Sequence, residues 1–364
     1  MSAAPPPAVT VVVPTHNRAG LVRATLDSLF AQDHRPLELV VVDDGSTDGT
    51  ADVVQAWAAD HPGDPAAGWG MQVLEQANAG ACAARNRGFA ASSAPLVVFF
   101  DSDDLLNTGA LARQAAVFAD RPEVAFVWSD LTFFRGAPGL SRPPWNRPPG
   151  GRPLADHLGG NLLQTSNGMS RRELVEAAGG WPAGAVCGDD WEFNARLLAA
   201  AERLGRPVAY LPGLTLLVRI HDAGRLLGRM DAARGVREQR ETVARVGDWL
   251  RREGLLDGPP GGELRAGLVR RLHALRGRAV DAGVPEELHA LAAAAAELGC
   301  PDPVRLPERL FARLPAPVRA ARRRAGHVLK RFGVGTAGPR AAAEPGPPRV
   351  LPPPATADRT RPPR

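Results

Sequence analysis

Residues 97–104 read VVFFDSDD, an uninterrupted apolar run followed by three carboxylates. A strand of Val and Phe without alternation is typical of a strand covered on both faces, as in a parallel sheet with helices on either side. Asp101, Asp103 and Asp104 follow at its carboxyl end. Because like charges at such short spacing repel one another, these acids indicate a site for a cation or a hydrogen-bonding ligand rather than a stabilising feature.

The segments around this stretch alternate between strand and helix. Strands are predicted in VTVVV (9–13), LELVVV (37–42), MQVLEQ (71–76) and PLVVFF (95–100), with helices over 18–32, 50–60 and 82–92 between them. This alternation predicts an α/β fold with a doubly wound, mostly parallel, Rossmann-like sheet. Ligands of such sheets bind outside the carboxyl ends of the strands. Three of these ends carry polar residues, in VVVPTHN (11–17), VVVDDGSTDGT (40–50) and VVFFDSDD.

The chain beyond residue 109 divides into three further parts. Helices near 110–120 and 190–204 and strands in 124–134 and 208–221 extend the sheet domain to about 225, with a Pro- and Gly-rich loop at 135–153. Residues 226–332 are predicted to be a helical C-terminal extension, and the Pro-rich tail 333–364 to be disordered. We therefore predict a disordered start (1–8), a domain over 9–225 with halves 9–108 and 109–225, the extension, and the tail.

Composition narrows the class of protein. The 364 residues suffice for a sizeable core, and the 44 Lys and Arg exceed the 39 Asp and Glu mainly near the C-terminus. Cys82, Cys187 and Cys300 form no CxxC pair, which argues against a zinc or redox motif and favours the cytosol. No apolar stretch approaches the roughly 18 residues of a membrane span, and the start lacks a signal-peptide pattern. We expect a cytoplasmic protein, or one bound peripherally to the inner face of the cell membrane.

The two aspartate clusters each allow a structural interpretation. In DDGSTDGT (43–50), Gly45 could simply make a turn and Ser46, Thr47 or Asp48 cap the next helix. DSDD (101–104) could likewise be a turn with a helix cap. The functional interpretation is that these carboxylates bind the base or ribose of a nucleotide, or a metal ion. Two acidic clusters at two strand ends in one half of a sheet favour binding, because both would face the same crevice.

Five segments together resemble the family 2 glycosyltransferases of the GT-A fold over residues 9–225. They are VTVVVPTHNR (9–18), VVVDDGSTDGT, NAGACAARNRG (78–88), VVFFDSDD and GDDWEF (188–193). The resemblance implies a nucleotide-diphospho-sugar donor, UDP-linked in our interpretation, a Mn²⁺ or Mg²⁺ ion, and transfer with inversion at the anomeric carbon. It further implies a glycan or lipid-linked saccharide as acceptor, in the biosynthesis of cell-surface polysaccharide or glycoconjugate.

The resemblance also implies roles for individual residues. Asp44 matches the aspartate that contacts the nucleobase, and Asp101 and Asp103 match the DxD pair that contacts ribose and metal. Hard oxygen ligands of this kind suit a hard divalent ion. Arg85 either contacts the nucleotide or is a solvated helix arginine. The remaining positions implied for the nucleotide pocket are Pro14, Thr15, Asn17, Asp43, Asn78, Gly80 and Ser102.

The later motifs provide the proposed acceptor side. Asp190 in GDDWEF matches the general base, although an N-cap role is an alternative, and Asp189 stands where the family usually has Glu. Asn167, Gly168, Trp181, Asp189 and Trp191 are tentative acceptor residues by position. His221 in VRIHDAGR (218–225) matches an element that contacts metal or diphosphate, and a satisfied structural histidine is the alternative.

Two other functions, and a contact with lipid, are alternatives for this sequence. A sugar-nucleotide nucleotidyltransferase shares the fold class and the metal, but PTHNRAG (14–20) lacks the Gly-rich phosphate loop expected after its first strand. A catalytically silent sugar-binding relative is disfavoured by the acids at 44, 101, 103 and 190. The basic segment 319–332 is either a solvated helix or a peripheral contact to anionic lipid. No nucleic-acid recognition motif is visible, so we expect no nucleic-acid partner.

Overall fold

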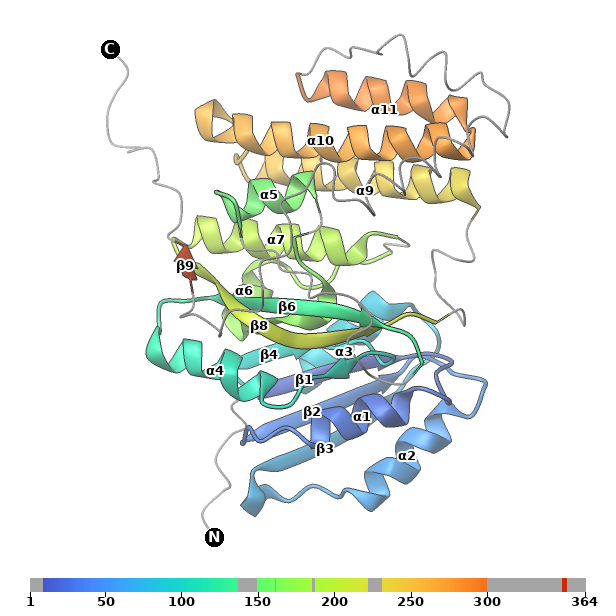
Figure 1. The fold of residues 1–364 in the computed structure, drawn as a ribbon, viewed down its shortest axis with the longest axis vertical. Helices are drawn as coiled ribbons and strands as arrows, with labels where there is room; N and C mark the ends of the chain where they lie inside the picture. The colour runs from blue at the N-terminus through green and yellow to red at the C-terminus, as the bar shows by residue number, and fades with distance from the viewer. Residues whose placement is uncertain are drawn as a thin grey trace.

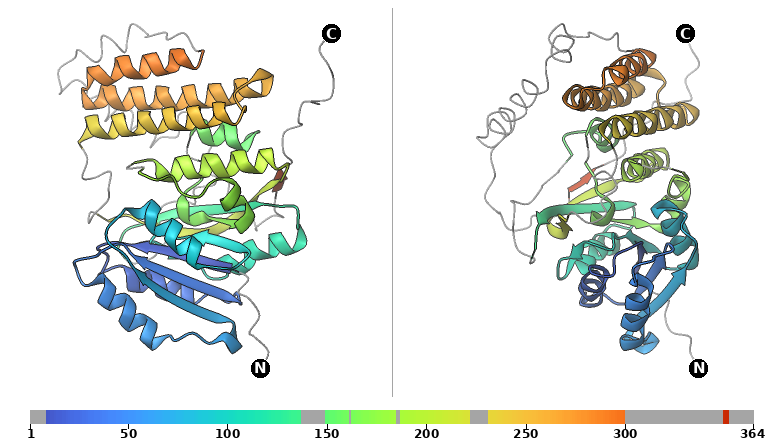
Figure 2. Two further views of the ribbon diagram at one scale, coloured as in Figure 1. Left: turned by 180° about the vertical axis from the view of Figure 1, so that it is seen from behind. Right: turned by 90° about the vertical axis from the view of Figure 1, so that its right-hand side faces the viewer.

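The computed structural model describes residues 9–136, 149–160, 162–184, 187–221, 231–299 and 349–351. Within these ranges the strands form one nine-stranded sheet with the order β3-β2-β1-β4-β7-β6-β8-β5, and β9 pairs with β8. Helices cover both faces of the sheet, and three further helices stack on one side of it (Figures 1 and 2). The mixed α/β architecture predicted from the sequence is thus confirmed.

The first half of the sheet is parallel and carries the predicted buried strands. Its strands are β1 (Val9–Thr15), β2 (Leu37–Asp43), β3 (Trp69–Glu75) and β4 (Leu96–Phe99). Every residue of β1, β2 and β4 is buried, as the apolar runs of their sequences require. The connecting helices are α1 (Val22–Phe30), α2 (Thr50–Asp60) and α3 (Ala81–Ala91). This arrangement puts the ends of β1, β2 and β4 at one edge of the sheet.

The second half mixes strand directions. Its strands are β5 (Leu105–Leu106), β6 (Phe126–Phe134), β7 (Gly168–Arg171) and β8 (Val208–Arg219). β7 runs antiparallel to β4 and β6, whereas β8 runs parallel to β6 with register shifts around Asp130. The helices of this half are α4 (Ala110–Asp120), α5 (Pro153–Gly159), α6 (Arg172–Ala177) and α7 (Asp189–Arg203), with short 3₁₀ turns at 65–67 and 165–167. The sheet therefore continues past β4 and carries the end of β8 toward the acids after β4.

Beyond the sheet domain, the chain forms α9 (Ala232–Arg252), α10 (Gly258–Ala282) and α11 (Pro285–Glu297). Local signals explain their ends: the Asp231 side chain caps α9, Gly283 ends α10 in the left-handed conformation, and Pro285 opens α11. The helical nature of the C-terminal part, predicted from the sequence, is confirmed. None of the described helices has the length and apolar character that a membrane crossing requires.

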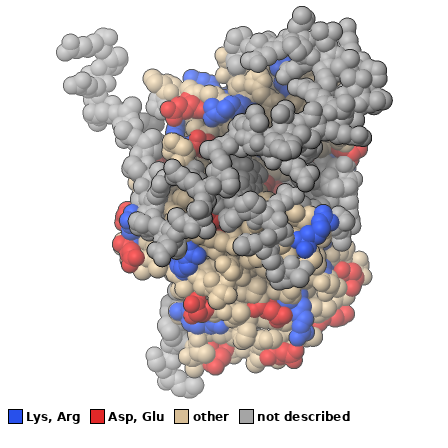
Figure 3. Space-filling model, in the orientation of Figure 1, with Lys and Arg blue, Asp and Glu red and all other residues tan. Residues whose placement is uncertain are grey.

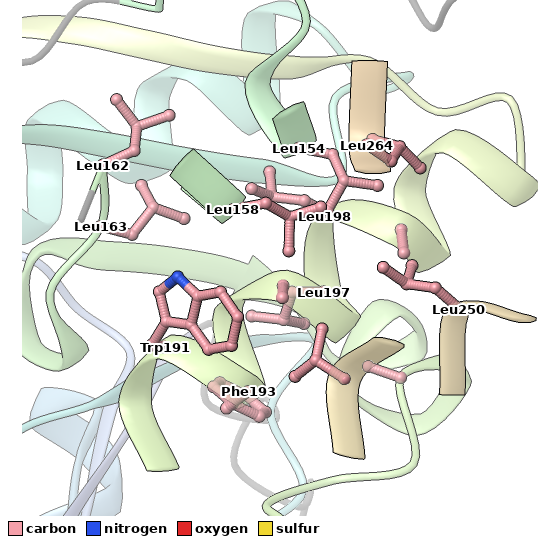
Figure 4. Packing of buried hydrophobic residues seen from close by; sticks show 14 of the residues in the cluster. Leu154, Leu158, Leu162, Leu163, Trp191, Phe193, Leu197, Leu198, Leu250 and Leu264 are labelled. Atoms are coloured by element: carbon pink, nitrogen blue, oxygen red, sulfur yellow. The ribbon is translucent and has the colours of Figure 1, made fainter. Parts of the chain in front are cut away.

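These helices share one hydrophobic core with the sheet domain. Apolar side chains of α5 and α7 meet those of α9 and α10 in a single cluster, which includes Leu158, Leu198, Leu250 and Leu264 (Figure 4). A second cluster on the opposite face of the sheet is made with α1, α2 and α4. The C-terminal helices are thus packed against the sheet domain through buried apolar surface and share its core.

Two boundaries differ from the sequence prediction. The first helix begins at Val22 rather than near Arg18, because the backbone and side chain of Arg18 are engaged with the neighbouring loops. Part of the segment predicted to be disordered is a strand, β9 (Arg349–Leu351), which pairs antiparallel with Val208–Tyr210. The edge of β8 offers free backbone groups there, and a short Arg-Val-Leu segment can satisfy them. The predicted disordered start 1–8 and basic segment 319–332 lie outside the described residues.

Candidate active site

The polar loops after β1, β2 and β4 lie together with the end of β8. Thr15 of β1 pairs with Asp43 of β2, and the next residue, Asp44, donates its N–H to the Thr15 carbonyl at 2.9 Å. At the same edge, Arg219 and His221 from the end of β8 reach the acids that follow β4. The structure therefore brings both aspartate clusters and His221 to one edge of the sheet, as the resemblance implied.

Asp103 is the centre of one group of charges. Its Oδ2 lies 2.9 Å from Nε2 of His221 and 3.2 Å from Nε of Arg18. Arg219 donates from Nε to the Asp103 carbonyl at 2.8 Å and from its backbone N–H to the buried Asp104 carboxylate at 2.9 Å. The other ring nitrogen of His221, Nδ1, is buried and has no hydrogen-bond partner among the described residues. Asp103 and His221 thus face each other, with one imidazole nitrogen left over.

Asp101 is held by a different set of partners. Its backbone N–H donates to Oγ of Ser166 at 3.0 Å, and its Oδ1 accepts from Nη2 of Arg85 at 2.8 Å. Burial raises the pKa of the Asp101 carboxyl, Arg85 opposes this effect, and the nearby charge of Asp103 adds to it. Ser102 between the two acids is buried. An additional cation near Asp101 would therefore stabilise its ionised form.

Arg85 of α3 joins this group to the start of α7. Its Nη2 binds Asp101, and its Nη1 lies 3.0 Å from Oδ2 of Asp189. The guanidinium also lies 4.1 Å from the centre of the Trp181 ring. With only 6% of its surface exposed, Arg85 is not a solvated helix arginine. In this structure it connects the DxD acids with the acidic pair of GDDWEF.

Asp190 is the second residue of α7, next to this bridge. Gly188, in the left-handed conformation, is the N-cap of the helix, so Asp190 does not cap it. Burial, followed by the charge of Asp189, raises the pKa of the Asp190 carboxyl to about 6, although the Trp191 N–H donates to it at 2.7 Å and opposes the shift. A carboxyl group with a pKa near the working pH is suited to accept a proton.

The nucleotide side is built by Asp44 and the loop before α3. The Asp44 carboxylate accepts from the N–H groups of Ala79 and Gly80 at 2.8 Å each, and from Nε2 of Gln76 at 2.7 Å. Gly45 is required here, because a Cβ on it would lie 2.8 Å from the Asn78 nitrogen, and its φ is +70°. Asp44 therefore orders this loop through its own side chain. Any contact with a nucleobase stays a proposal.

The other nucleotide-pocket positions surround His16. Nδ1 of His16 lies 2.9 Å from the Asp44 carbonyl and 3.2 Å from Nδ2 of Asn78. Asn17 has a φ of 53°, and its Oδ1 accepts from the Thr47 N–H at 2.9 Å. The remaining positions are Asp43, which accepts from both the N–H and the hydroxyl of Ser46, Gly80 at the N-cap of α3, and Pro14 and the buried Thr15 at the end of β1. The predicted positions thus lie on neighbouring loops.

Four tentative acceptor residues occupy packing positions instead. Trp181 and Trp191 are 2% and 1% exposed and belong to the hydrophobic core, where Trp181 stacks on Phe193. The amide of the buried Asn167 donates to the Ser129 carbonyl at 2.9 Å, and a Cβ on Gly168 would lie 2.5 Å from the Phe126 ring. These four residues are buried in this structure, and their role toward an acceptor stays a prediction. Of the tentative acceptor residues, Asp189 alone lies in the charged group.

Two contacts of the site are not predicted from the sequence. Arg18 pairs with Asp103, and Ser166 binds the backbone of Asp101. Arg18 is the last residue of the quoted segment VTVVVPTHNR, so its place on the loop after β1 was a usable signal. Ser166 lies 65 residues away in sequence, within the 3₁₀ turn before β7, and no local pattern marks it.

Comparison with known proteins agrees with this geometry. The family model described as Glycosyl transferase family 2 matches residues 10–176. An uncharacterised glycosyltransferase of Nostoc sp. is 31% identical over 177 residues, which are 46% of this chain and 52% of that protein. A PGL/p-HBAD biosynthesis glycosyltransferase of Mycobacterium bovis is 32% identical over 126 residues, or 34% of this chain and 47% of that one. The chain thus spans about half the length of these relatives.

A solved structure with the same fold is S. aureus TarS 1-349 in complex with UDP-GlcNAc. The likeness has a TM-score of 0.51 at 18% identity and covers 80% of this chain and 88% of that one. At this identity the likeness concerns the fold alone, which is that of the GT-A glycosyltransferases. Residues 10–176 of this chain thus match the model of glycosyl transferase family 2, in agreement with the quoted motifs and with the fold.

Proposed function

We propose that the protein is a metal-dependent, inverting glycosyltransferase that transfers a sugar from a nucleotide-diphospho-sugar to a hydroxyl group of a glycan or lipid-linked saccharide. The observation that carries this proposal is the bridge through Arg85. By binding Asp101 and Asp189 together, Arg85 sets the acids of the donor side beside the start of α7, where Asp190 lies. A donor and an acceptor hydroxyl can then meet between these two groups.

Asp190 is the proposed general base. Its raised pKa, about 6, leaves the carboxyl group mostly ionised at pH 7 yet more basic than an ordinary aspartate. It would take the proton of the acceptor hydroxyl as that oxygen attacks the anomeric carbon from the face opposite the diphosphate, which inverts the configuration. Arg85, held against Trp181, fixes the neighbouring Asp189 and keeps it apart from this proton transfer.

The side chains at Asp103 fit a hard divalent ion such as Mn²⁺ or Mg²⁺. Asp101 and Asp103 offer carboxylate oxygens, and His221, in contact with Asp103, has a buried ring nitrogen without a partner. Among the described residues, no group of three or more His, Cys, Asp or Glu side chains is placed to hold a metal ion. The proposed ion would therefore need further oxygen ligands from the donor. When bound, the ion would neutralise charge on the departing nucleoside diphosphate.

The donor and acceptor remain proposals. We take UDP-linked sugars first because TarS, which shares the fold, was crystallised with UDP-GlcNAc. A role in cell-surface polysaccharide or glycoconjugate biosynthesis is consistent with the name of the M. bovis relative. We further propose a cytoplasmic location with peripheral attachment to the inner face of the membrane through residues 319–332, which lie outside the described part of the chain.

Donor hydrolysis tests the proposed class of reaction. The full chain would be incubated with UDP-, GDP-, TDP- and CMP-sugars in Mn²⁺, and the released nucleotide measured with and without EDTA. We expect hydrolysis of one donor class that stops in EDTA. Release of pyrophosphate from a nucleoside triphosphate and a sugar phosphate would instead identify a nucleotidyltransferase. Binding of donors without any turnover, also when acceptor glycans are added, would identify a silent relative.

A further inference from the structure

The C-terminal helix α10 brings an arginine to the start of α7. The guanidinium of Arg271 lies 5.2 Å from the centre of the ring of Trp191, the residue that follows Asp190. Asp190 and Cys187 both interact electrostatically with Arg271, and so does the buried ring of His157. Arg271 therefore faces the same end of α7 as the proposed catalytic base, from the side opposite to the sheet.

Arg271 lacks the partners that neighbouring arginines of α10 have. Its Nε is buried and unpaired, and among the described residues no hydrogen bond or ion pair involves its side chain. By contrast, Arg270 donates to the Ala155 carbonyl at 3.2 Å, and Arg278 donates to Oε1 of Gln239 at 2.8 Å. Burial and the charge of Arg278 lower the pKa of Arg271, and the charge of Asp190 opposes this effect. The residue is nevertheless partly exposed, so a ligand can reach it.

Apart from the ring of Trp191, the guanidinium of Arg271 has no hydrogen-bonding or ion-pair partner among the described residues, and this calls for an explanation. Burying a charge without a partner is costly, and buried polar groups in native proteins are nearly always paired. The planar guanidinium is matched by a phosphate or a carboxylate, which can accept two parallel hydrogen bonds from it. The missing partner of Arg271 is therefore best supplied by an oxyanion of this kind.

The helix that carries Arg271 is firmly placed. Gly267, one turn earlier, packs so closely on α5 that a Cβ would lie 2.9 Å from the Ala155 carbonyl oxygen. Leu264, Leu268 and Leu272 of α10 are fully or almost fully buried in the core that α5 and α7 share. Arg271 is thus held on a rigid element, as a group that orients a ligand must be.

We propose that Arg271 binds an anionic group of the acceptor, a phosphate or a carboxylate, and thereby sets the acceptor hydroxyl beside Asp190. This inference rests on the proposed function. The donor side is formed by the loops after β1, β2 and β4, whereas Arg271 comes from a helix beyond the residues that the family model matches. The C-terminal helices would then select for acceptors that carry negative charge.

A binding experiment tests the anion site with inorganic phosphate as the probe. The melting temperature of the full chain would be measured for wild type, R271Q, R271K and R278Q. Each protein is measured in phosphate and in chloride at equal ionic strength, with EDTA present in both. A ligand that binds the folded state alone raises the melting temperature, here by about 2–4 °C at phosphate concentrations well above its Kd. We expect this specific gain in wild type and R278Q, a smaller gain in R271K, and none in R271Q.

R278Q is the control for charge alone: it removes a neighbouring exposed charge of the same helix that repels Arg271, but it leaves the Arg271 guanidinium in place. R271Q should melt in chloride within about 4 °C of the wild-type temperature, since the contact that it loses is the one with the Trp191 ring. An equal phosphate gain in wild type and R271Q would overturn the proposal. So would a fall of more than about 4 °C for R271Q in chloride, because a structural role would then explain the residue.

A kinetic arm identifies which substrate carries the anion. In donor hydrolysis with water as acceptor, the donor KM of R271Q should stay within about twofold of the wild-type value. A raised donor KM would place the anion on the donor and overturn the assignment to the acceptor. If wild type hydrolyses no donor, the proposed function fails, whereas the phosphate experiment still decides whether Arg271 holds an anion.

Discussion

Asp101 and Asp190, near the two ends of the Arg85 bridge, differ in the groups that offset the effect of burial on their carboxylates. Asp101 has a direct partner, since Arg85 lies 2.8 Å from it. Asp190 has only the N–H of Trp191 at short range and carries the added repulsion of Asp189, so burial raises its pKa to about 6. The carboxylate of Asp101 is therefore suited to bind cations, whereas that of Asp190 is suited to accept a proton.

The pH dependence of transfer tests the role of Asp190. A base must be ionised, so the rate at saturating donor should rise with pH through about 6 and level off above 7. Asp190→Asn should lower the rate by about 10²- to 10⁴-fold and remove this rise, because the amide cannot accept the proton. Calorimetric donor affinity should stay near normal. Collapsed donor affinity with surviving turnover would place Asp190 in the donor pocket.

The same shift makes a prediction for stability. Between the ordinary carboxyl pKa of 3.8 and about 6, the folded chain holds a proton on Asp190 that the unfolded chain has lost. The free energy of unfolding contributed by this group therefore falls as pH rises through that window. Asp190→Asn should make this part of the decline disappear when urea unfolding is followed from pH 4 to 7. An unchanged pH profile would contradict the raised pKa.

Asp103 is predicted to be indispensable for metal use. Its carboxylate contacts both Arg18 and His221, so Asp103→Asn removes the anion around which these two side chains are arranged. Transfer should be abolished, and any residual donor hydrolysis should need much more Mn²⁺, which a metal titration would measure. Glu173→Gln is a suitable control, since it removes an exposed acid that pairs with Arg206. Full activity of Asp103→Asn in EDTA would rule out the proposed metal site.

At the scale of elements, α3 must approach the sheet closely to deliver Arg85. Gly88 permits this, because a Cβ there would lie 2.4 Å from Val12 and 3.1 Å from Val42. The same helix begins at Gly80, whose N–H is bound by Asp44. The position of the Arg85 bridge is thus set by contacts at both ends of α3, one with the loop after β2 and one with the strands beneath.

Glycine substitutions test this close packing. Gly88→Ala should lower the free energy of unfolding by about 1–3 kcal/mol, since the methyl group forces the helix away from two β-branched side chains. Gly277→Ala is the matched control: it lies in α10 with open space around it, and it should stabilise the fold by about 0.5–1 kcal/mol through helix propensity. Both values come from urea unfolding. Equal effects at the two positions would contradict the packing described here.

For the whole molecule, the core between the layers matters more than the charge pattern of the visible face. On the face drawn in Figure 3, basic and acidic side chains of the described residues lie interspersed. The layers are instead held by the apolar core between the sheet domain and the C-terminal helices, in which Val246 and Leu250 of α9 and Leu291 of α11 are fully buried. The boundary at residue 225, set from composition, therefore does not separate two independent cores.

Two truncations distinguish these contributions. A chain ending at residue 332 loses β9, which pairs with Val208–Tyr210, whereas the site lies near the opposite end of β8 at Arg219. We expect it to keep most donor hydrolysis and to lose little stability. A chain ending at residue 225 exposes the apolar surfaces of α5 and α7 and should aggregate. Light scattering would measure aggregation, and a donor-hydrolysis assay would measure activity. Soluble, active protein from the chain ending at residue 225, or loss of activity in the chain ending at residue 332, would contradict these expectations.

Local patterns in the sequence predicted most of the elements and the edge of the sheet at which the two aspartate clusters lie. Helix 50–60 was predicted with its observed ends, because Thr50 and Asp60 bound a clear helical pattern. The aspartates after β2 and β4 were expected at one edge, because parallel strands put their carboxyl ends there. Such features depend on residues near one another in the chain, whose propensities and polarity can be seen directly.

What only the tertiary structure decided are the partners of each side chain. Arg85, which the sequence places either at the nucleotide or in solvent, binds Asp101 and Asp189, the latter 104 residues away, and a contact with the nucleotide stays a prediction. Trp191, a candidate for stacking on sugar, is covered in the core, while Arg271 of α10 reaches its ring. Burial and pairing across such separations are set by how layers pack. A sequence pattern records which residue types a helix or strand carries, but not which element will lie against them.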